Sequence, residues 1–598
     1  MSNYKGNRTN TINNIQSFLV EPESIIKTGN DHYFIDFGKD AFGTLVLSIK
    51  SSRKDTLIIH LGEKAVNSIK VDTDPGGTIR YQRILLPIFP STSDYTIKLP
   101  RDSSNTTPPA VELPDSFGVI MPFRYCELEN LKIPISDLTI KQKVYNYHFN
   151  DTASSFICSD TILNHVWELC KYSIKATSFC GIYIDGDRER IPYEADALIN
   201  QLSHYCVDND YSMARRTCEY FISNPTWPTE WILHTVLLFY YDYLYTGNIE
   251  SIKKNYEALK VKTLIDLERS DGLISSKSEK LTDELMKKLG FKDFKQRIID
   301  IVDWPSAQFE ESSKSETPLG ERDGYDMVEI NTVVNSFYYM NLKLMVEIAG
   351  YLGKKEDSVF FQRKSIIVKN VINQKLFDKS KGIYIDGENS KHSSLHANMF
   401  PLAFGIVSSE NMHSVVSFIK TRGMSCSVYG AQYLLEGLFK TNEADYALKL
   451  MTSTNDRSWW NMIRSGSTIT TEAWDIKYKK NMDWNHPWGS APANIITRYL
   501  CGITPVHPGF KKVQIRPQLS NLTFSKIKVP TTKGSINAEY KKINDKYKKI
   551  TIEIPSGMNA VFVPDDNNSE IFLNYKKLKS NGFSVQLKEG TNLIELKN

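Results

Sequence analysis

The sequence predicts a multidomain, mainly α protein in which an (α/α)6 barrel is flanked by an N-terminal β-sandwich and a C-terminal antiparallel β-domain. Three observations support this fold class. The chain has 598 residues, which at about 150 residues per domain suggests roughly three or four units. Apolar and polar residues alternate near both ends of the chain, as they do in strands. Between these regions the apolar period lengthens to about 3.6 residues, as it does in helices.

The N-terminal region begins with a polar, Asn-rich tail, residues 1–20. Residues 21–150 then read as strands separated by Gly, Asp and Pro, in "HYFIDFGKDAFGTLVLSIK", "DTLIIHLGEK" and "GTIRYQRILLPI". We interpret this region as a β-sandwich that serves as a scaffold.

The central region, residues 151–503, is predicted to be helical. In "DTILNHVWELCKYSIKAT" the residues Ile162, Val166 and Leu169 fall on one helical face. About twelve helical patterns precede Gly502, and six helical hairpins would close a ring. They include residues 231–245, 331–351, 358–376, 395–406, 429–439 and 491–500.

The C-terminal region, residues 504–598, returns to strand patterns. They occur in "KKVQIRPQL", "KKITIEIPS" and "FSVQLKEGTNLIEL". These segments predict an antiparallel β-domain, so the order along the chain is β, then α, then β.

Composition excludes several classes of function. The 73 basic and 69 acidic residues are intermixed and nearly cancel to +4, which argues against nucleic acid as a partner. The eight cysteines have irregular spacing without a C-x-x-C pair, which indicates buried thiols instead of a zinc site or a disulfide framework. No signal peptide or membrane span is visible. A full-length chain would be cytoplasmic, and a chain whose signal was removed would be periplasmic or secreted.

The first candidate site is the stretch "DGDRERIPYEAD", which places five acidic residues and two Arg in twelve positions before an apolar helix. An N-capping loop would explain one or two acids, but not five. Carboxylates packed among guanidinium groups in a cleft can divide into ionised groups that bind hydroxyls and a protonated group that acts as an acid.

The second candidate site lies within "TITTEAWDIKYKKNMDWNHPWGSAP", which contains Glu472, Trp474, Asp475, Asp483, Trp484, His486 and Trp488. Aromatic rings can stack on the apolar faces of a sugar while carboxylates bind its hydroxyl groups. Two carboxylates on opposite sides of a sugar suffice for hydrolysis of a glycosidic bond, so we expect neither a metal nor a cofactor. A carbohydrate is the expected partner, whereas the oligomeric state is left open.

With these motifs the chain resembles the α-L-rhamnosidases of glycoside hydrolase family 78 over nearly its whole length. The family pattern is an Arg-Asp-Glu-Arg-x-Gly-Trp-x-x-Asp loop, a later Trp loop with a Glu, and a His before the last barrel helix. The resemblance implies an inverting hydrolase that releases terminal α-L-rhamnose, with Glu189 as general acid and Glu472 as general base. It implies sugar contacts from Asp185 or Asp187, Arg190, Tyr193, Asp196, Trp231, Asp303, Trp304, Trp474 and His486.

Three features depart from the family pattern. Pro192 stands where the family has Gly, Tyr193 stands where it has Trp, and "YIDGD" replaces the Asp-Cys-Pro lead-in. These changes affect the walls around the sugar, and small changes in such walls can alter the substrate. Another pyranose or 6-deoxy sugar therefore stays open beside rhamnose, as do the linkage and the aglycone.

Two alternatives compete with the hydrolase. A polysaccharide lyase on the same toroid would use Tyr193, Tyr429 or His396 as its base. A lyase neutralises a uronate carboxylate, and an acid-rich loop opposes such a pocket. A non-catalytic carbohydrate-binding protein would lack one of the two catalytic carboxylates, and both are present in this chain.

Overall fold

The computed structural model describes residues 14–306, 320–564, 570–578 and 584–597, and it divides into two compact units. The first unit comprises Met1–Phe149, Leu169–Pro192 and Trp459–Ser490. The second comprises Asn150–Glu168, Tyr193–Ser458 and Ala491–Asn598. Two central segments, 169–192 and 459–490, therefore group with the N-terminal strands instead of with the neighbouring helices in the sequence.

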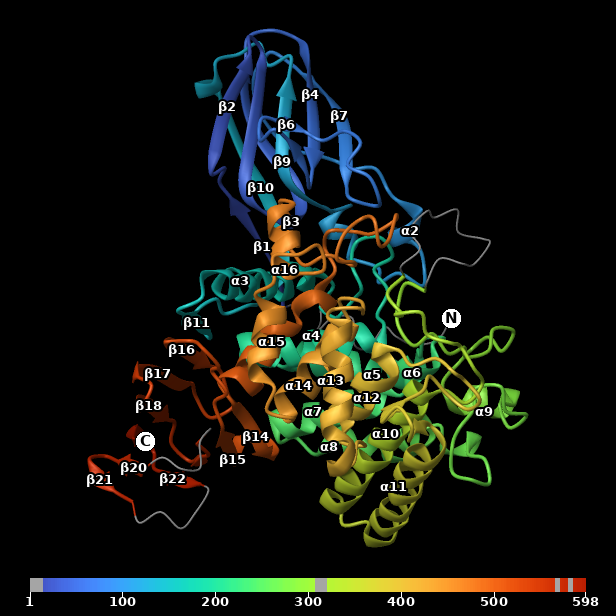
Figure 1. Cartoon of the computed structure of the whole chain (residues 1–598). Helices are drawn as coiled ribbons and strands as arrows, with labels where there is room; N and C mark the ends of the chain where they lie inside the picture. The colour runs from blue at the N-terminus through green and yellow to red at the C-terminus, as the bar shows by residue number, and fades with distance from the viewer. Residues whose placement is uncertain (1–13, 307–319, 565–569, 579–583, 598) are drawn as a thin grey trace. The chain divides into compact units, whose positions relative to one another are not determined.

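The first unit is built on an antiparallel sheet with the order β1-β10-β3-β9-β4-β7, in which β2 and β8 also pair with β3 (Figure 1). Its regular elements are β1 (Ile15–Val20), β2 (Ser24–Gly29), β3 (His32–Ser51), β4 (Asp55–Gly62), β5 (Ala65–Val66), β6 (Lys70–Val71), β7 (Tyr81–Ile88), β8 (Ser91–Thr96), α2 (Ser103–Thr106), β9 (Met121–Glu129), β10 (Leu138–Tyr147) and α16 (Trp459–Arg464).

Strand β3 organises this sheet because it changes neighbours along its length. Its first part pairs with β2 and β9, and its second part pairs with β10 and β8. The ladder with β9 shifts register between Asp36 and Ala41, where the strand changes partners. Alternating residues of β3, including Leu45, Leu47 and Ile49, are buried in the main hydrophobic cluster. The strands predicted from the alternating pattern are confirmed.

The prediction of a polar tail over residues 1–20 is wrong in part. Residues 1–13 lie outside the described residues, but Ile15–Val20 forms β1 at the edge of the sheet. Most side chains of this strand are exposed, so no apolar alternation marks it. Backbone pairing with β10 holds it in place, and backbone pairing leaves little trace in the sequence.

The second unit contains most of the helices (Figure 1). They are α4 (Glu194–Val207), α5 (Ser212–Ser223), α6 (Thr229–Ile232), α7 (His234–Thr246), α8 (Glu250–Lys262), α9 (Asp283–Lys288), α10 (Thr332–Tyr351), α11 (Lys355–Lys375), α12 (Leu395–Phe404), α13 (Met412–Arg422), α14 (Gly430–Lys440), α15 (Ala444–Met451) and α17 (Ala491–Ile495), while the boundary between the units passes through α3 (Thr161–Ala176).

Caps fix the ends of several of these helices. The side chain of Asn331 accepts a hydrogen bond from the Val334 amide at 2.8 Å and so begins α10. Ser394 begins α12 in the same way, and Gly405 ends it with φ of 72°. Helix α10 buries a long run of apolar side chains that includes Phe337. The helical positions predicted from the 3.6-residue period match these elements to within a few residues.

The second unit also contains the C-terminal strands. One sheet has the order β11-β16-β17-β18-β23-β20-β21 and another has the order β14-β15-β19-β22, while β12 and β13 form a small separate hairpin. The strands are β11 (Ser155–Cys158), β12 (Phe377–Asp378), β13 (Ile383–Tyr384), β14 (Ile503–His507), β15 (Lys512–Ile515), β16 (Phe524–Val529), β17 (Ile536–Asn544), β18 (Tyr547–Ile554), β19 (Asn559–Phe562), β20 (Glu570–Leu573), β21 (Lys576–Lys577), β22 (Val585–Leu587) and β23 (Gly590–Lys597).

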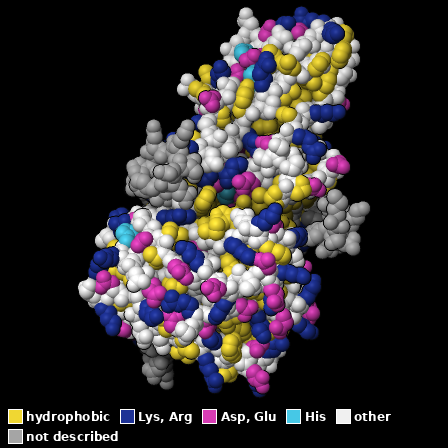
Figure 2. Space-filling model, turned by 90° about the vertical axis from the view of Figure 1, so that its right-hand side faces the viewer, with side chains coloured by type: hydrophobic (Ala, Val, Ile, Leu, Met, Phe, Trp, Pro, Cys, Tyr) yellow, Lys and Arg dark blue, Asp and Glu magenta, His cyan; other side chains and the backbone are white. Residues whose placement is uncertain are grey.

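These elements confirm a helical region with an N-terminal and a C-terminal β region. All eight cysteines are buried free thiols, as the spacing predicted. Figure 2 shows basic and acidic side chains interspersed on the face in view, in keeping with the nearly balanced charge. Within the described ranges, no helix combines the length and the apolar character that crossing a membrane requires.

Candidate active site in the first unit

The acidic loop between residues 185 and 191 folds back on itself in the first unit. The Asp185 amide donates to the Ile191 carbonyl at 2.9 Å, and the Arg190 amide donates to the Gly186 carbonyl at 3.1 Å. Arg190 has φ of 53°, a left-handed conformation that only a well-determined loop holds at a non-glycine residue. The loop therefore presents its side chains from a fixed backbone.

Arg188 connects the two predicted catalytic carboxylates. Its Nη1 and Nη2 donate to Oε2 and Oε1 of Glu472 at 2.5 and 2.8 Å. Its Nε lies 3.6 Å from Oε1 of Glu189. Glu472 is almost fully buried, whereas the Glu189 side chain is 36% exposed. One carboxylate is therefore enclosed by charge partners, and the other is open to solvent.

The surroundings of Glu472 keep it ionised. Burial alone would raise its pKa, but the charge of Arg188, followed by those of Lys479 and His486, lowers the pKa to about 2. Lys479 Nζ lies 3.2 Å from Oε1 of Glu472. Together these partners occupy three of about four acceptor positions on the carboxylate.

Asp187 and Arg190 fasten the loop to the N-terminal sheet. Asp187 accepts from Nε of Arg80 at 2.5 Å and from Nε and Nη2 of Arg190 at 3.0 and 2.6 Å. Arg190 also donates to the Ile120 carbonyl at 2.7 Å. Both side chains of the pair are at most 3% exposed. The predicted contacts of Asp187 and Arg190 with substrate stay predictions. In the structure, the hydrogen bonds of these two side chains hold the acidic loop in place.

Asn485 connects the acidic loop to the second candidate loop. Its Oδ1 accepts from the Asp187 amide at 2.7 Å, and its Nδ2 donates to Oε1 of Glu63 at 2.9 Å. Glu63 directly follows β4. A small apolar cluster also packs Ile79 with three residues of the second candidate loop, Ala473, Met482 and Trp484. The N-terminal β region therefore acts as a scaffold that holds both loops.

Asp185 and His486 are buried beside these carboxylates. Oδ1 of Asp185 accepts from the Ile191 amide at 2.9 Å. Burial raises the pKa of Asp185 well above its usual value, and nearby His486 opposes the shift. Nδ1 of His486 lies 3.2 Å from Oδ1 of Asp483. A protonated Asp185 carboxyl is suited to donating a hydrogen bond.

Glu472, Asp483 and His486 also converge closely enough to bind a cation. Glu472 already receives two hydrogen bonds from Arg188 and faces Lys479. A cation at this point would have to compete with two basic side chains. The charge pattern therefore favours acid–base chemistry at this site over metal chemistry.

Trp474 occupies a different environment from the one predicted. It is about 1% exposed and packs edge-to-face on Trp459, with ring centroids 5.0 Å apart. Composition suggested a sugar platform, but this ring is buried against Trp459. Trp488 has a comparable role, since its Nε1 donates to the Glu472 carbonyl at 3.0 Å.

The second unit contains the remaining predicted sugar contacts. Tyr193 precedes α4 and packs edge-to-face on Trp231, with centroids 5.3 Å apart. Trp304 contacts Trp227 in the same manner at 6.4 Å. Asp196 lies in the first turn of α4 and is buried.

Asp303 is fully buried in the second unit and is held by neighbours. Its Oδ2 lies 2.6 Å from Nε2 of His396 and accepts from the Ser427 amide at 2.9 Å. Nearby Glu230 accepts hydrogen bonds from the Ile301 and Val302 amides, and burial raises its pKa to about 8. These contacts organise the loop around Asp303, and its contact with substrate stays a prediction.

Sequence reasoning missed two residues that shape the first-unit site: Arg188 and Lys479. Arg188 stands directly before Glu189 in a stretch rich in acids, where a basic residue is expected to pair with one of them. Which carboxylate it pairs with depends on a contact across 284 positions of the chain. Sequence spacing carries no signal for that pairing.

Comparison with known proteins points to one family. Residues 151–500 match the model of the bacterial alpha-L-rhamnosidase 6 hairpin glycosidase domain, and residues 502–575 match the model of the bacterial alpha-L-rhamnosidase C-terminal domain. The first match alone covers more than half of the chain. The chain belongs to this bacterial α-L-rhamnosidase family.

Relatives of this rhamnosidase-family chain agree with the assignment. An alpha-L-rhamnosidase of Alteromonas sp. is 22% identical over 90% of this chain and 60% of its own length. Among solved structures, the alpha-L-rhamnosidase of Dictyoglomus thermophilum has a TM-score of 0.74 at 15% identity and covers 98% of this chain and 64% of its own. That of Streptomyces avermitilis, complexed with L-rhamnose, has a TM-score of 0.74 at 13% identity over 98% of this chain and 54% of its own.

This chain matches only part of the length of these relatives. It spans about 60% of the length of the curated rhamnosidases that it matches. The solved structures, all below 20% identity, show a shared fold. The family predicted from the two loops is therefore confirmed.

Proposed function

We propose that this chain is an inverting glycoside hydrolase that releases terminal α-L-rhamnose, with Glu189 as general acid and Glu472 as general base. The observation that carries the proposal is the bridge that Arg188 forms between these two carboxylates. This bridge supports a single site in which the two carboxylates differ in their solvent exposure and in their charged partners. Family membership supports the rhamnosidase assignment, and the six-hairpin model supports closure of the helices into an (α/α)6 barrel.

The proposed reaction divides the work between the two carboxylates. Protonated Glu189 donates a proton to the glycosidic oxygen as the bond to the anomeric carbon breaks. Ionised Glu472 takes a proton from the water that attacks the opposite face of the sugar. Arg188 contacts both carboxylates, and the proposal requires their carboxyl groups to stand roughly 6.5–9.5 Å apart, as in inverting enzymes.

Arg188 has a second proposed role, in controlling the strength of the base. A carboxylate with a pKa near 2 is a weak base at neutral pH. A substrate hydroxyl that draws Arg188 away would let burial raise the pKa of Glu472. The base would then become effective only when the site holds substrate.

Replacing each carboxylate by its amide tests the proposal. Glu189→Gln should lower kcat by several orders of magnitude on a rhamnosyl disaccharide but less on p-nitrophenyl α-L-rhamnoside, because nitrophenolate leaves with little protonation. Glu472→Gln should lower kcat by several orders of magnitude on both substrates, because both require activated water. Steady-state kinetics on matched preparations measures the difference.

The control is Glu168→Gln, because Glu168 is exposed on α3. It should retain full activity, and circular dichroism should show all three variants folded. A near-normal rate on the disaccharide in either Glu189→Gln or Glu472→Gln would reject the assignment of the residue that was replaced.

The sugar itself is tested separately, because Pro192 and Tyr193 depart from the family pattern. We expect aryl α-L-rhamnoside to be cleaved faster than the corresponding fucoside, mannoside and glucuronide. A preference for another glycoside would keep the hydrolase and change its substrate. An unsaturated product that absorbs in the ultraviolet would instead indicate a lyase.

A further inference from the structure

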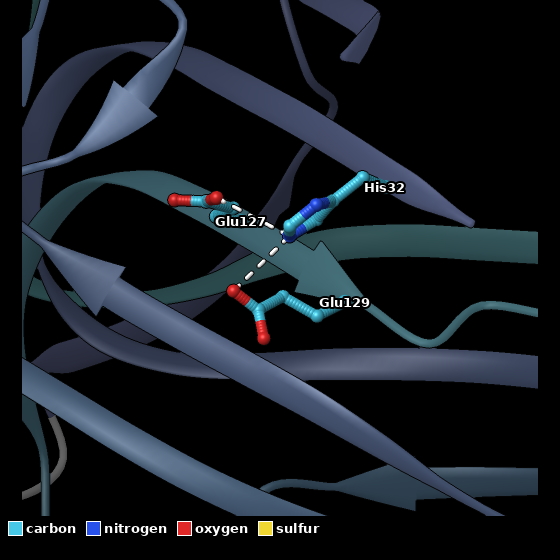
Figure 3. A group of neighbouring side chains, drawn as sticks. All are labelled: His32, Glu127 and Glu129. Carbon is cyan, nitrogen blue, oxygen red and sulfur yellow. Dashed lines mark ion pairs between the residues drawn. The ribbon is translucent and has the colours of Figure 1, made fainter. Parts of the chain in front are cut away.

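A group of His and Glu side chains lies on one face of the N-terminal sheet, outside the candidate active site. His32 begins β3, Glu127 and Glu129 end β9, and His60 lies on β4. Strand β9 pairs with both neighbours, so that His32 stands opposite Glu129 and His60 stands opposite Glu127. Residues 127 and 129 share a face because strand side chains alternate. Figure 3 shows both carboxylates beside the His32 ring.

The contacts within this group have the geometry of ligands around a shared centre. Nε2 of His32 lies 3.1 Å from Oε1 of Glu129 and 3.4 Å from Oε1 of Glu127. One ligand atom from each of the three residues lies within 4.8 Å of the others. Ligand atoms around a tetrahedral zinc ion with bonds of about 2.0–2.1 Å stand roughly 3.3–3.4 Å apart. The observed separations are close to that value.

The ring nitrogens that face these carboxylates are not placed for well-formed hydrogen bonds. Within the described residues, Nε2 of His32 and Nε2 of His60 are shielded from solvent and make no hydrogen bond. The His60 side chain is only 9% exposed, and its Nε2 points to Oε1 of Glu129 at 3.4 Å. Buried ring nitrogens of this kind usually have a partner. A cation bound between His32 and the two carboxylates would give Nε2 of His32 such a partner.

The charge of the group also favours a cation. In the part of the chain that the structure describes, the ion pairs of Glu127 and Glu129 involve only the two histidines, with no Lys or Arg. Glu127 is 5% exposed, and its Oε2 accepts from the Val71 amide at 3.0 Å. A divalent cation would neutralise the negative charge that these two carboxylates bring together.

We propose that His32, Glu127 and Glu129 bind a divalent transition-metal ion of the zinc class, with water in the remaining position. Imidazole nitrogen with carboxylate oxygen is a donor set that zinc accepts, whereas calcium and magnesium prefer oxygen alone. The side chains of His32 and Glu129 are about one-third exposed, which leaves a path for the ion and its water. The ion would connect β3 to β9.

His60 acts as a positioning residue for this site. Its Nδ1 is hydrogen-bonded to the Tyr81 hydroxyl at 2.7 Å, which fixes the ring with Nε2 against Glu129. Metal-binding carboxylates and histidines are commonly oriented by such outer contacts. The proposed metal lies in the scaffold and takes no part in the hydrolysis proposed above, so each can fail without the other.

Calorimetry with zinc chloride on the chelator-treated, untagged full chain tests the proposal. The wild type should bind one zinc at this site, and its Tm should rise when zinc is added. Glu129→Gln, which preserves shape, and His32→Ala should each weaken zinc binding at least tenfold and abolish the rise in Tm. Calcium and magnesium should produce neither effect.

Two controls locate the site. His148→Ala removes an exposed histidine elsewhere in the first unit, and His486→Ala removes the histidine of the other candidate cation cluster. Both variants should keep the zinc affinity of the wild type. Absence of zinc binding in the wild type, unchanged binding in folded Glu129→Gln, or loss of binding in His486→Ala would each overturn the proposal.

Discussion

Glu472 is ionised because a guanidinium and an ammonium group face it inside a buried site. Burial and these charges act in opposite directions on its pKa, and the charges prevail by a wide margin. The balance depends mainly on Arg188, which makes two hydrogen bonds to the carboxylate. The base is therefore controlled by a neighbour of the acid, since Arg188 directly precedes Glu189.

Replacing Arg188 should change the pH dependence of the reaction. With the pKa of Glu472 near 2, the base is ionised at every pH above that value, so the wild-type kcat/KM should have no acidic limb above about pH 4. In Arg188→Gln the burial of Glu472 dominates and its pKa rises. The kcat/KM of the variant should then fall as the pH drops below about 6, because protonated Glu472 cannot accept a proton.

The matched control for this pH profile is Arg101→Gln, because Arg101 is exposed. It should follow the wild-type profile. An Arg188→Gln profile that coincides with that of the wild type down to pH 4 would show that Arg188 does not set the pKa of the base.

Single residues show how far the sequence could be interpreted. Local composition pointed to both loops, because acids, Arg and Trp are unusual in such density, and the family resemblance singled out Glu189 and Glu472 within them. It could not separate exposed from buried members: Trp474, Asp187 and Arg190 are all buried. The proposed cation site escaped notice because His32 lies on β3 and its two carboxylates lie on β9, far along the chain and with no motif spacing.

At the scale of elements, the start of β7 is a brace for the acidic loop. Arg80 directly precedes this strand and contacts Asp187 through its side chain at 2.5 Å. It also contacts Asp102 at 2.6 Å. Helices α10 and α12 were predictable from local caps and periodicity, but this brace depends on a contact between distant segments.

Arg80→Met should destabilise the protein and slow the reaction together. Asp187 would lose a charge partner in a buried position, which costs about 2–4 kcal/mol of unfolding free energy for a pair that is partly exposed. The acidic loop would loosen, and kcat should fall about tenfold or more, since small displacements of catalytic groups are costly. Urea unfolding and steady-state kinetics measure the two effects.

Arg83→Met is the matched control, because Arg83 lies on β7 three residues after Arg80 but is exposed. It should leave both quantities near the wild-type values. Equal stability and activity in the Arg80 and Arg83 variants would show that Arg80 does not hold the acidic loop in place.

At the scale of the whole molecule, the order β, α, β was predictable because the hydrophobic period changes sharply near residues 151 and 503. The compact units do not follow that linear order, since residues 169–192 and 459–490 group with the N-terminal β region. Such grouping depends on tertiary contacts between loops and scaffold. Both candidate catalytic carboxylates lie in these two segments, so the scaffold unit carries the proposed chemistry.

The most direct test of the central claim is the configuration of the sugar at the moment of release. Proton NMR should follow p-nitrophenyl α-L-rhamnoside with enough enzyme to outpace mutarotation. Glu189 and Glu472 acting from opposite faces in a single displacement predict that β-L-rhamnose appears first and the α-anomer grows in later. Appearance of α-L-rhamnose first would show retention and contradict the assignment of Glu472 as a base that activates water.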